Sequence, residues 1–216
     1  MTKPLYCLKY SAMNDPALSA DDVLVAFVDL QAGIVNLGIT NTPARLRTAV
    51  SALADLAAAF SLPVVISCVP TTSAAVAPLL PEIAQRLPDA KPLVRSTANA
   101  MDDEPFCAAL AAFGRKTLIV AGVATEVAVR LMALSAARQG FRAIVAVDAC
   151  GGLNERTESA ALMHLAGAGI ELSAVATIAA QLAGDFNSEL GRAAMLALQS
   201  TLPAHAGAHE PAAGRA

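Results

Sequence analysis

Short apolar runs rich in β-branched residues alternate with longer stretches rich in alanine and leucine along this sequence. The brevity and composition of the runs are typical of buried parallel strands, and the longer stretches place apolar residues at helical spacing. Such alternation is the pattern of βαβ units around a parallel sheet. We therefore predict an α/β fold, a three-layer α/β/α sandwich around a mainly parallel sheet with Rossmann-like topology.

The boundaries of the expected elements follow from these patterns and from the Gly, Pro and polar residues that end them. Strands are expected at residues 23–30, 63–69, 117–123 and 142–148, with weaker strands near Leu93 and at residues 170–173. Helices are expected at residues 43–60, 125–139 and 157–168. Ligands of such sheets lie outside the carboxyl ends of the strands, so the residues that follow strands are the candidates for function.

The length and hydropathy of the chain bound its organisation. Its 216 residues suit one domain, which we place at residues 1–202, with a disordered tail at residues 203–216, where apolar periodicity is lost. Hydrophobic residues make up 56% of the chain. The longest apolar runs nevertheless fall far below the roughly 20 residues of a membrane span, and residues 1–15 lack the apolar core of a signal peptide. We expect a cytoplasmic protein that does not bind a membrane.

The cysteines, histidines and charges exclude several classes of function. Cys7, Cys68, Cys107 and Cys150 have no CxxC spacing, and two of the three histidines lie in the tail, so we expect free thiols, no metal and no cofactor. A formal charge of −3 without a long Lys/Arg run argues against nucleic acid, which leaves a small molecule as the expected partner. The high apolar fraction with only 15% charged residues predicts a homo-oligomer, because a monomer would expose apolar patches.

The acidic residue Asp29 lies near the end of the first expected strand, where a buried strand reaches the ligand face. Gln31 follows two residues later, on the same side of an extended chain. A carboxyl group at this place can transfer protons, and the alternative is that Asp29 caps a turn or pairs with a nearby arginine.

A tight turn containing Gly122 joins the strand at residues 117–123 to the next helix, for which Thr125 is the expected N-cap. Backbone N–H groups at a helix N-terminus favour anions and lower the pKa of a thiol. The methyl group of Ala128 supplies no chemistry here, and the alternative is a capped helix that only packs on the sheet. Arg95 and Asn99 follow the weak strand near Leu93, so Arg95 could bring a permanent cation to the same edge, or form a surface ion pair instead.

Five segments in this order resemble the isochorismatase-like cysteine hydrolases. They are residues 28–31 (Val-Asp-Leu-Gln), Arg95 with residues 99–103 (Asn-Ala-Met-Asp-Asp), residues 121–127 (Ala-Gly-Val-Ala-Thr-Glu-Val), residues 134–141 (Leu-Ser-Ala-Ala-Arg-Gln-Gly-Phe) and residues 147–152 (Val-Asp-Ala-Cys-Gly-Gly). The similarity spans about residues 21–186 and is greatest to the YcaC-like branch.

The resemblance implies a catalytic triad of Asp, a cation and Cys that hydrolyses small amides and imides. It places Asp29 as the general base, Arg95 where the family has Lys or Arg, and Ala128 at the position of the nucleophile. It implies substrate-binding roles for Gln31 and Asn99. It also implies a cis peptide bond between Val123 and Ala124 that, with Thr125, forms an oxyanion hole.

Alanine at position 128 leaves three interpretations open. In the first, the chain is a hydrolase that needs no nucleophile and protonates a vinyl ether through Asp29, as true isochorismatases do by this resemblance. In the second, it is a non-catalytic binding or assembly protein. In the third, alanine has been engineered in place of the cysteine of an amidase.

Overall fold

The computed structural model describes residues 18–37, 39–70 and 76–201. The tail predicted at residues 203–216 and Cys7 lie outside the described residues. Six parallel strands form one sheet in the order β3-β2-β1-β4-β5-β6. The strands are β1 (Val23–Val28), β2 (Val64–Cys68), β3 (Pro92–Val94), β4 (Thr117–Val123), β5 (Arg142–Gly151) and β6 (Glu171–Ser173).

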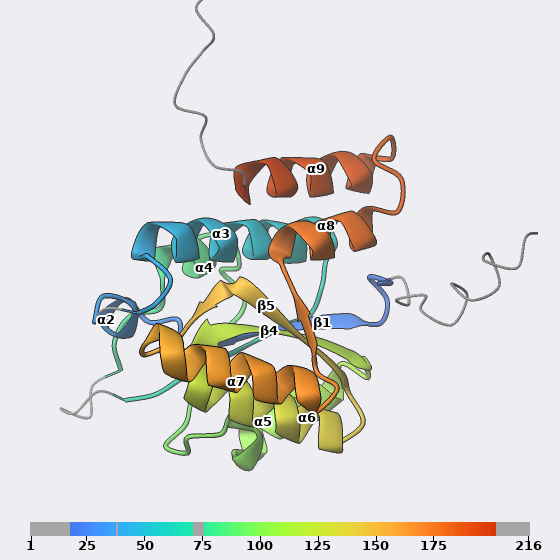
Figure 1. Cartoon of the computed structure of the whole chain (residues 1–216). Coiled ribbons are helices and arrows are strands. Elements are labelled where there is room, and N and C mark those ends of the chain that lie inside the picture. Colours follow the sequence, from blue (N-terminus) through green and yellow to red (C-terminus); the bar gives the residue numbers. More distant parts are fainter. Residues whose placement is uncertain (1–17, 38, 71–75, 202–216) are drawn as a thin grey trace, which may run out of the picture.

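Helices cover both faces of this sheet, so the predicted three-layer sandwich is confirmed (Figure 1). One face carries α3 (Pro43–Ala59) and α8 (Val175–Ala183), and α9 (Glu189–Thr201) packs on the outer side of these two helices. The other face carries α5 (Glu104–Ala112), α6 (Arg130–Arg138) and α7 (Glu155–Gly167). Shorter turns of helix are α2 (Ala32–Val35), α4 (Pro81–Ala84), the 3₁₀ turn Ala100–Asp102 and the π-helical turn Thr125–Val129.

The central strands are buried on both faces because helices pack above and below them. Every residue of β1 and β4 is buried, and the side chains of β1 alternate between the two apolar cores. The predicted strands are found with small shifts, of which the largest extends β5 to Gly151. Helices α5, α8 and α9 were not predicted from periodicity. Among the described helices, none is both long and apolar enough to cross a membrane.

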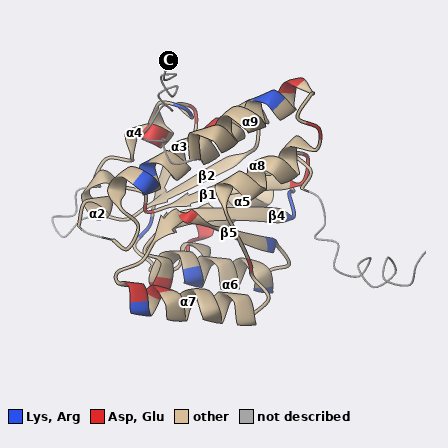
Figure 2. Cartoon of the chain, turned by 45° about the horizontal axis from the view of Figure 1, so that its top comes forward, with Lys and Arg blue, Asp and Glu red and all other residues tan. Residues whose placement is uncertain are grey.

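Charged residues are sparse on the helices and gather near helix ends and loops (Figure 2). Helix α8 carries none, and on α9 they lie within the first four residues. At the start of α3, an uncharged polar side chain caps the helix. Thr42 accepts a hydrogen bond from the backbone N–H of Arg45, and Pro43 occupies the first turn, where its missing N–H costs nothing.

The strand order has its reversal point between β1 and β4. From β1 the chain proceeds outward through β2 and β3, and it then returns to β4 and proceeds the other way through β5 and β6. In open parallel sheets the loops separate at this point and leave a crevice at the carboxyl ends of the two strands. Val28 is in register with Gly122, so Asp29 and Val123 are the residues at which β1 and β4 reach this crevice.

Replacement of Gly122 by alanine should destabilise the protein, because an added Cβ would lie 2.4 Å from the backbone oxygen of Val28. Neither paired strand can move without loss of ladder hydrogen bonds, so the free energy of unfolding should fall by about 1–3 kcal/mol. Gly167→Ala is the control, because nothing lies within 4 Å of its added Cβ. Urea unfolding that shows equal losses for the two variants would contradict this close approach of β1 and β4.

Candidate functional site

At Asp29, directly after β1, the backbone leaves its extended conformation, and the carboxyl group lies at the crevice. Its φ angle of 54° is in the left-handed region, which Asp tolerates better than most residues. Its backbone N–H donates to the carbonyl of Ser67 on β2 at 2.9 Å, and the residue is only 5% exposed. The turn ends the alternation of side chains, so Gln31 does not follow Asp29 on the same side, as an extended chain would require.

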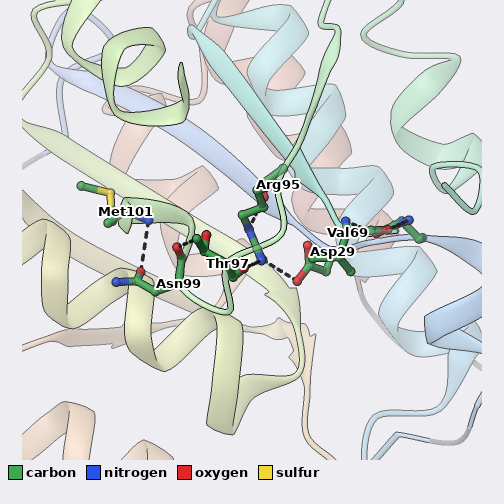
Figure 3. Close-up of polar contacts among 8 residues, drawn as sticks. Asp29, Val69, Arg95, Thr97, Asn99 and Met101 are labelled. Atoms are coloured by element: carbon green, nitrogen blue, oxygen red, sulfur yellow. Dashed lines mark hydrogen bonds and ion pairs between the residues drawn. The ribbon is translucent and has the colours of Figure 1, made fainter. Parts of the chain in front are cut away.

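Arg95 forms a buried ion pair with Asp29 (Figure 3). Its Nη2 lies 2.6 Å from Oδ2 of Asp29, and the two side chains are 1% and 7% exposed. The Nε–H donates to the hydroxyl of Ser67 at 2.7 Å, and Nη1 donates to the carbonyl of Thr97. The guanidinium group is therefore held by three oxygens that come from different segments of the chain.

The second carboxyl oxygen of Asp29, Oδ1, is buried and has no hydrogen-bond partner among the described residues. Burial raises the pKa of Asp29 from 3.8 to about 6, although the charge and hydrogen bond of Arg95 pull it down. A carboxyl group with such a pKa can hold a proton in mildly acidic solution and release it near neutrality.

The π-helical turn Thr125–Val129 begins directly after β4. The Val123–Ala124 peptide bond is cis, as the resemblance implied. The N–H of Val129 bonds the carbonyl of Ala124 at 3.4 Å, the i to i−5 contact of a π turn, and such turns are frequent at functional sites. Ala128 lies within this turn, 3% exposed, and belongs to the same apolar core as Val28.

Comparison with known proteins identifies the family to which this fold belongs. Residues 23–177 match the family described as Isochorismatase domain. The chain belongs to the isochorismatase family. It is 38% identical over 177 residues to a protein named Probable hydrolase YcaC from Escherichia coli (strain K12), across 80% of this chain and 83% of that protein.

Two solved structures of YcaC proteins are similar to this isochorismatase-family fold. The E. coli YcaC gene product, described as an octameric hydrolase of unknown specificity, superposes with a TM-score of 0.81 at 34% identity and covers 94% of each chain. YcaC from Pseudomonas aeruginosa, with hexane-2,5-diol and covalent acrylamide, superposes with a TM-score of 0.80 at 33% identity, across 88% of this chain and 94% of that one.

Thr125 is not the N-cap that its sequence position predicted. The N-cap position of the π turn is Ala124, and no side chain caps it. The hydroxyl of Thr125 donates instead to Oε1 of Glu158 on α7, at 2.8 Å. The prediction was wrong because a carboxylate 33 residues further along the chain takes the hydroxyl that would have capped the turn.

Glu126 attaches the same turn to the start of α7. Its carboxylate accepts hydrogen bonds from the N–H of Leu153 at 2.9 Å and from the hydroxyl of Thr157 at 2.5 Å. Burial alone would raise the pKa of Glu126, but these hydrogen bonds outweigh it and lower the pKa. Gly152 lies beside the two acids, since an added Cβ would come within 2.6 Å of Glu158 Cβ. The π turn is therefore fixed by polar contacts on its outer side.

The side chains of Gln31 and Asn99 are committed to other protein groups. Gln31 donates to the carbonyls of Val69 and Ala77 and accepts from the N–H of Val69. Asn99 donates to Asp102 and Ser135 and accepts from the N–H of Met101. Through these contacts both residues hold the loops around the site in place. Substrate binding by either amide stays a prediction, and this geometry does not favour it.

The thiols of Cys68 and Cys150 have pKa values well above neutral pH. Burial raises the pKa of Cys68 to about 11, with a further contribution from the nearby charge of Asp29. Burial also raises the pKa of Cys150 to about 12. A thiol must ionise to become a nucleophile, so neither is poised to act as one.

Ser67 and Thr97 are the site residues that sequence analysis missed. Ser67 is a polar residue within the otherwise apolar strand β2, and this signal could have identified it. Thr97 contributes a backbone carbonyl, which no sequence pattern reveals.

No group of three potential metal ligands lies together within the described residues. An open hollow of about 560 Å³ lies near the end of β5, apart from Asp29 and Arg95. Its lining residues are Ile39, Thr40, Leu153, Asn154, Glu155 and Arg156.

The stability of the protein should depend on pH through Asp29. The folded pKa of about 6 exceeds the ordinary value of 3.8, so this group stabilises the fold at low pH and loses that contribution as the pH rises through about 6. Relative to Asp29→Asn, which does not titrate, the free energy of unfolding of the unaltered protein should fall by on the order of 2 kcal/mol between pH 4 and pH 7.5. Urea unfolding of both proteins at these pH values measures the difference, and a difference that does not change with pH would contradict the raised pKa.

Proposed function

We propose that this chain is a small-molecule hydrolase in which Asp29 transfers the proton and no side chain forms a covalent intermediate. The observation that carries the proposal is the buried carboxyl group of Asp29, with Oδ2 held by Arg95 and Oδ1 without a partner among the described residues. Membership of the isochorismatase family and similarity to a protein named as a probable hydrolase support the reaction class.

Water is the attacking group in this proposal. The resemblance assigns position 128 to the nucleophile, and alanine has no atom that can attack a carbonyl. The hydroxyl of Thr125 is engaged by Glu158, and the thiols of Cys68 and Cys150 stay protonated. The reaction that we propose therefore proceeds without an acyl-enzyme.

Hydrolysis of a vinyl ether meets this requirement. Protonated Asp29 gives its proton to the terminal carbon of the double bond, and the remaining cation is shared between the other carbon and the ether oxygen. Water adds to that carbon and returns a proton to the Asp29 carboxylate. The resulting hemiketal separates into a ketone and an alcohol, so one water is consumed and the carboxyl group is regenerated.

Arg95 and the turn after β4 support Asp29 in this reaction. Arg95 compensates the carboxylate that forms when the proton leaves, at a separation of 2.6 Å. The backbone groups of Val123, Ala124 and Thr125 are proposed to orient the polar end of the substrate, because they lie at and just after the end of β4, where it adjoins β1.

A non-catalytic binding role is the second candidate, and Ala128 is the observation that favours it. A family fold without its nucleophile can keep a pocket in which Asp29 and Arg95 orient an amide or an acid through hydrogen bonds. Binding without turnover distinguishes this role from hydrolysis.

We also propose that the chain assembles with copies of itself. The E. coli YcaC gene product is described as octameric. In this chain Leu153 and Met163, before and within α7, are 63% and 75% exposed, which suits an interface that covers α7.

Turnover of small vinyl ethers tests the proposed hydrolase. The unaltered protein should release ketone from a panel of such ethers, and Asp29→Asn should lose at least about 100-fold in kcat, the usual scale of general acid catalysis. Asp148→Asn is the matched control, because Asp148 is a half-buried carboxyl group whose pKa is also raised by burial, but it accepts from the N–H of Val175 at the start of α8.

Equal rates in Asp29→Asn and the unaltered protein would contradict the role of Asp29. Calorimetric binding of the same ethers with no ketone released would favour the binding role.

Introduction of cysteine at position 128 tests whether this is the nucleophile's place. Ala128→Cys should react with acrylamide, the compound held covalently in YcaC from P. aeruginosa, because backbone N–H groups at the start of a helical segment favour a thiolate. Val127→Cys is the matched control, since Val127 lies on the same turn and is 40% exposed.

Mass spectrometry over time should show faster labelling at position 128 than at position 127, although position 128 is only 3% exposed. Burst kinetics of Ala128→Cys with a small amide would indicate an amidase scaffold. A labelling rate no higher than that of Val127→Cys would contradict the assignment of position 128.

A further inference from the structure

We infer that Ser67 is a positioning residue that holds Arg95 in contact with only one oxygen of Asp29 and so keeps the other oxygen open to a ligand. The inference rests on the proposed function of Asp29. It assigns a role to a side chain of β2 that the resemblance does not include.

Ser67 contacts both members of the ion pair. Its hydroxyl accepts from Nε of Arg95 at 2.7 Å, and its backbone carbonyl accepts from the N–H of Asp29 at 2.9 Å. The residue is fully buried, and β2 holds it in register with Val28, the residue before Asp29. One position in the sheet therefore fixes the backbone of the acid and the side chain of its partner.

The contacts of the guanidinium group explain why it donates a hydrogen bond to only one oxygen of Asp29. A carboxylate binds a guanidinium group in bidentate fashion along an edge formed by two neighbouring N–H groups, either Nε with one Nη or both Nη groups. Ser67 occupies Nε, and the carbonyl of Thr97 occupies Nη1. Nε carries a single N–H, so the hydroxyl of Ser67 closes the Nε–Nη2 edge, and Asp29 contacts Nη2 alone.

The backbone of Arg95 is already fixed, so the hydroxyl of Ser67 acts on the direction of its side chain. The N–H of Arg95 donates to the carbonyl of Cys68 at 3.0 Å, next to Ser67 on β2. Ser67 and Thr97 are both neutral acceptors, and they orient the guanidinium group without neutralising it. Its charge remains available to Asp29 and to a ligand.

This arrangement preserves the proton-holding property of Asp29. The ionisable group that acts on Asp29 is Arg95, from the loop after β3, and Asp29 in turn raises the pKa of the Cys68 thiol on β2. A second hydrogen bond from Arg95 would stabilise the charged carboxylate and lower its pKa, which is raised to about 6 in the present geometry. It would also occupy Oδ1, the oxygen that has no partner among the described residues.

Two substitutions separate orientation from packing. Ser67→Ala removes the acceptor, so Arg95 is free to use Nε as well as Nη2 on Asp29. Ser67→Thr keeps the hydroxyl and suits a strand. Titration of the ¹³C-labelled Asp29 carboxyl by NMR should give a pKa near 6 in the unaltered protein and in Ser67→Thr, and a pKa shifted toward its ordinary value of 3.8 in Ser67→Ala.

The pH profile of vinyl ether hydrolysis is the second readout. The proposed reaction needs protonated Asp29, so kcat falls as the pH rises through the pKa of this group. In Ser67→Ala that fall should begin at lower pH, whereas in Ser67→Thr it should coincide with the unaltered protein. A purely structural role of Ser67 would lower kcat without moving the profile.

The titration requires no substrate, so it separates this inference from the proposed hydrolysis. An Asp29 pKa that is the same in folded Ser67→Ala and in the unaltered protein overturns the positioning role, whether or not a vinyl ether is hydrolysed. If Ser67→Ala does not fold, Ser67→Cys replaces it. A thiol is a weak acceptor, so the pKa of Asp29 should again fall, and an unchanged value overturns the inference.

Discussion

The site of this protein depends on an ion pair that has been removed from water. Asp29 and Arg95 meet at 2.6 Å with side chains 7% and 1% exposed. Burial of two charges costs more than their attraction returns unless further hydrogen bonds satisfy them. Arg95 obtains these from Ser67 and Thr97, whereas Asp29 keeps one oxygen without a partner in the described part of the chain. Arg95 therefore has a partner for each of its three guanidinium nitrogens, whereas Asp29 has a partner for only one of its carboxyl oxygens within the described residues.

The strand order explains why these two residues can meet although 66 positions separate them. Both follow parallel strands, and the carboxyl ends of parallel strands share one edge of the sheet. Parallel strands share this edge whatever helices connect them. The predicted strands and the positions of Asp29 and Arg95 after them were therefore enough to place the two residues at the same edge. Helices α8 and α9 supply none of the described hydrogen-bond partners of Asp29 and Arg95, so their omission from the predicted elements left the placement of the two residues unchanged.

Side-chain partners could not be predicted in the same way, because they come from segments distant in sequence. Thr125 has the residue type and position of an N-cap, yet its hydroxyl bonds Glu158 on a different helix. Gln31 would follow Asp29 on one face of an extended strand, but the left-handed turn at Asp29 redirects it to the backbone of Val69 and Ala77. The π turn at residues 125–129 likewise has no pattern of its own and resembles the first turn of a helix.

The satisfied polar groups around the crevice give the clearest argument for where a ligand binds. Buried polar atoms in folded proteins nearly always have a hydrogen-bond partner. Gln31 and Asn99 meet that condition through protein groups alone, and both are therefore parts of the frame. Oδ1 of Asp29 does not meet it within the described residues, and it lies at the reversal point of the sheet. A hydrogen-bond donor on a ligand would satisfy this atom, which supports our proposal that a ligand binds here, whether position 128 carries alanine or a nucleophile.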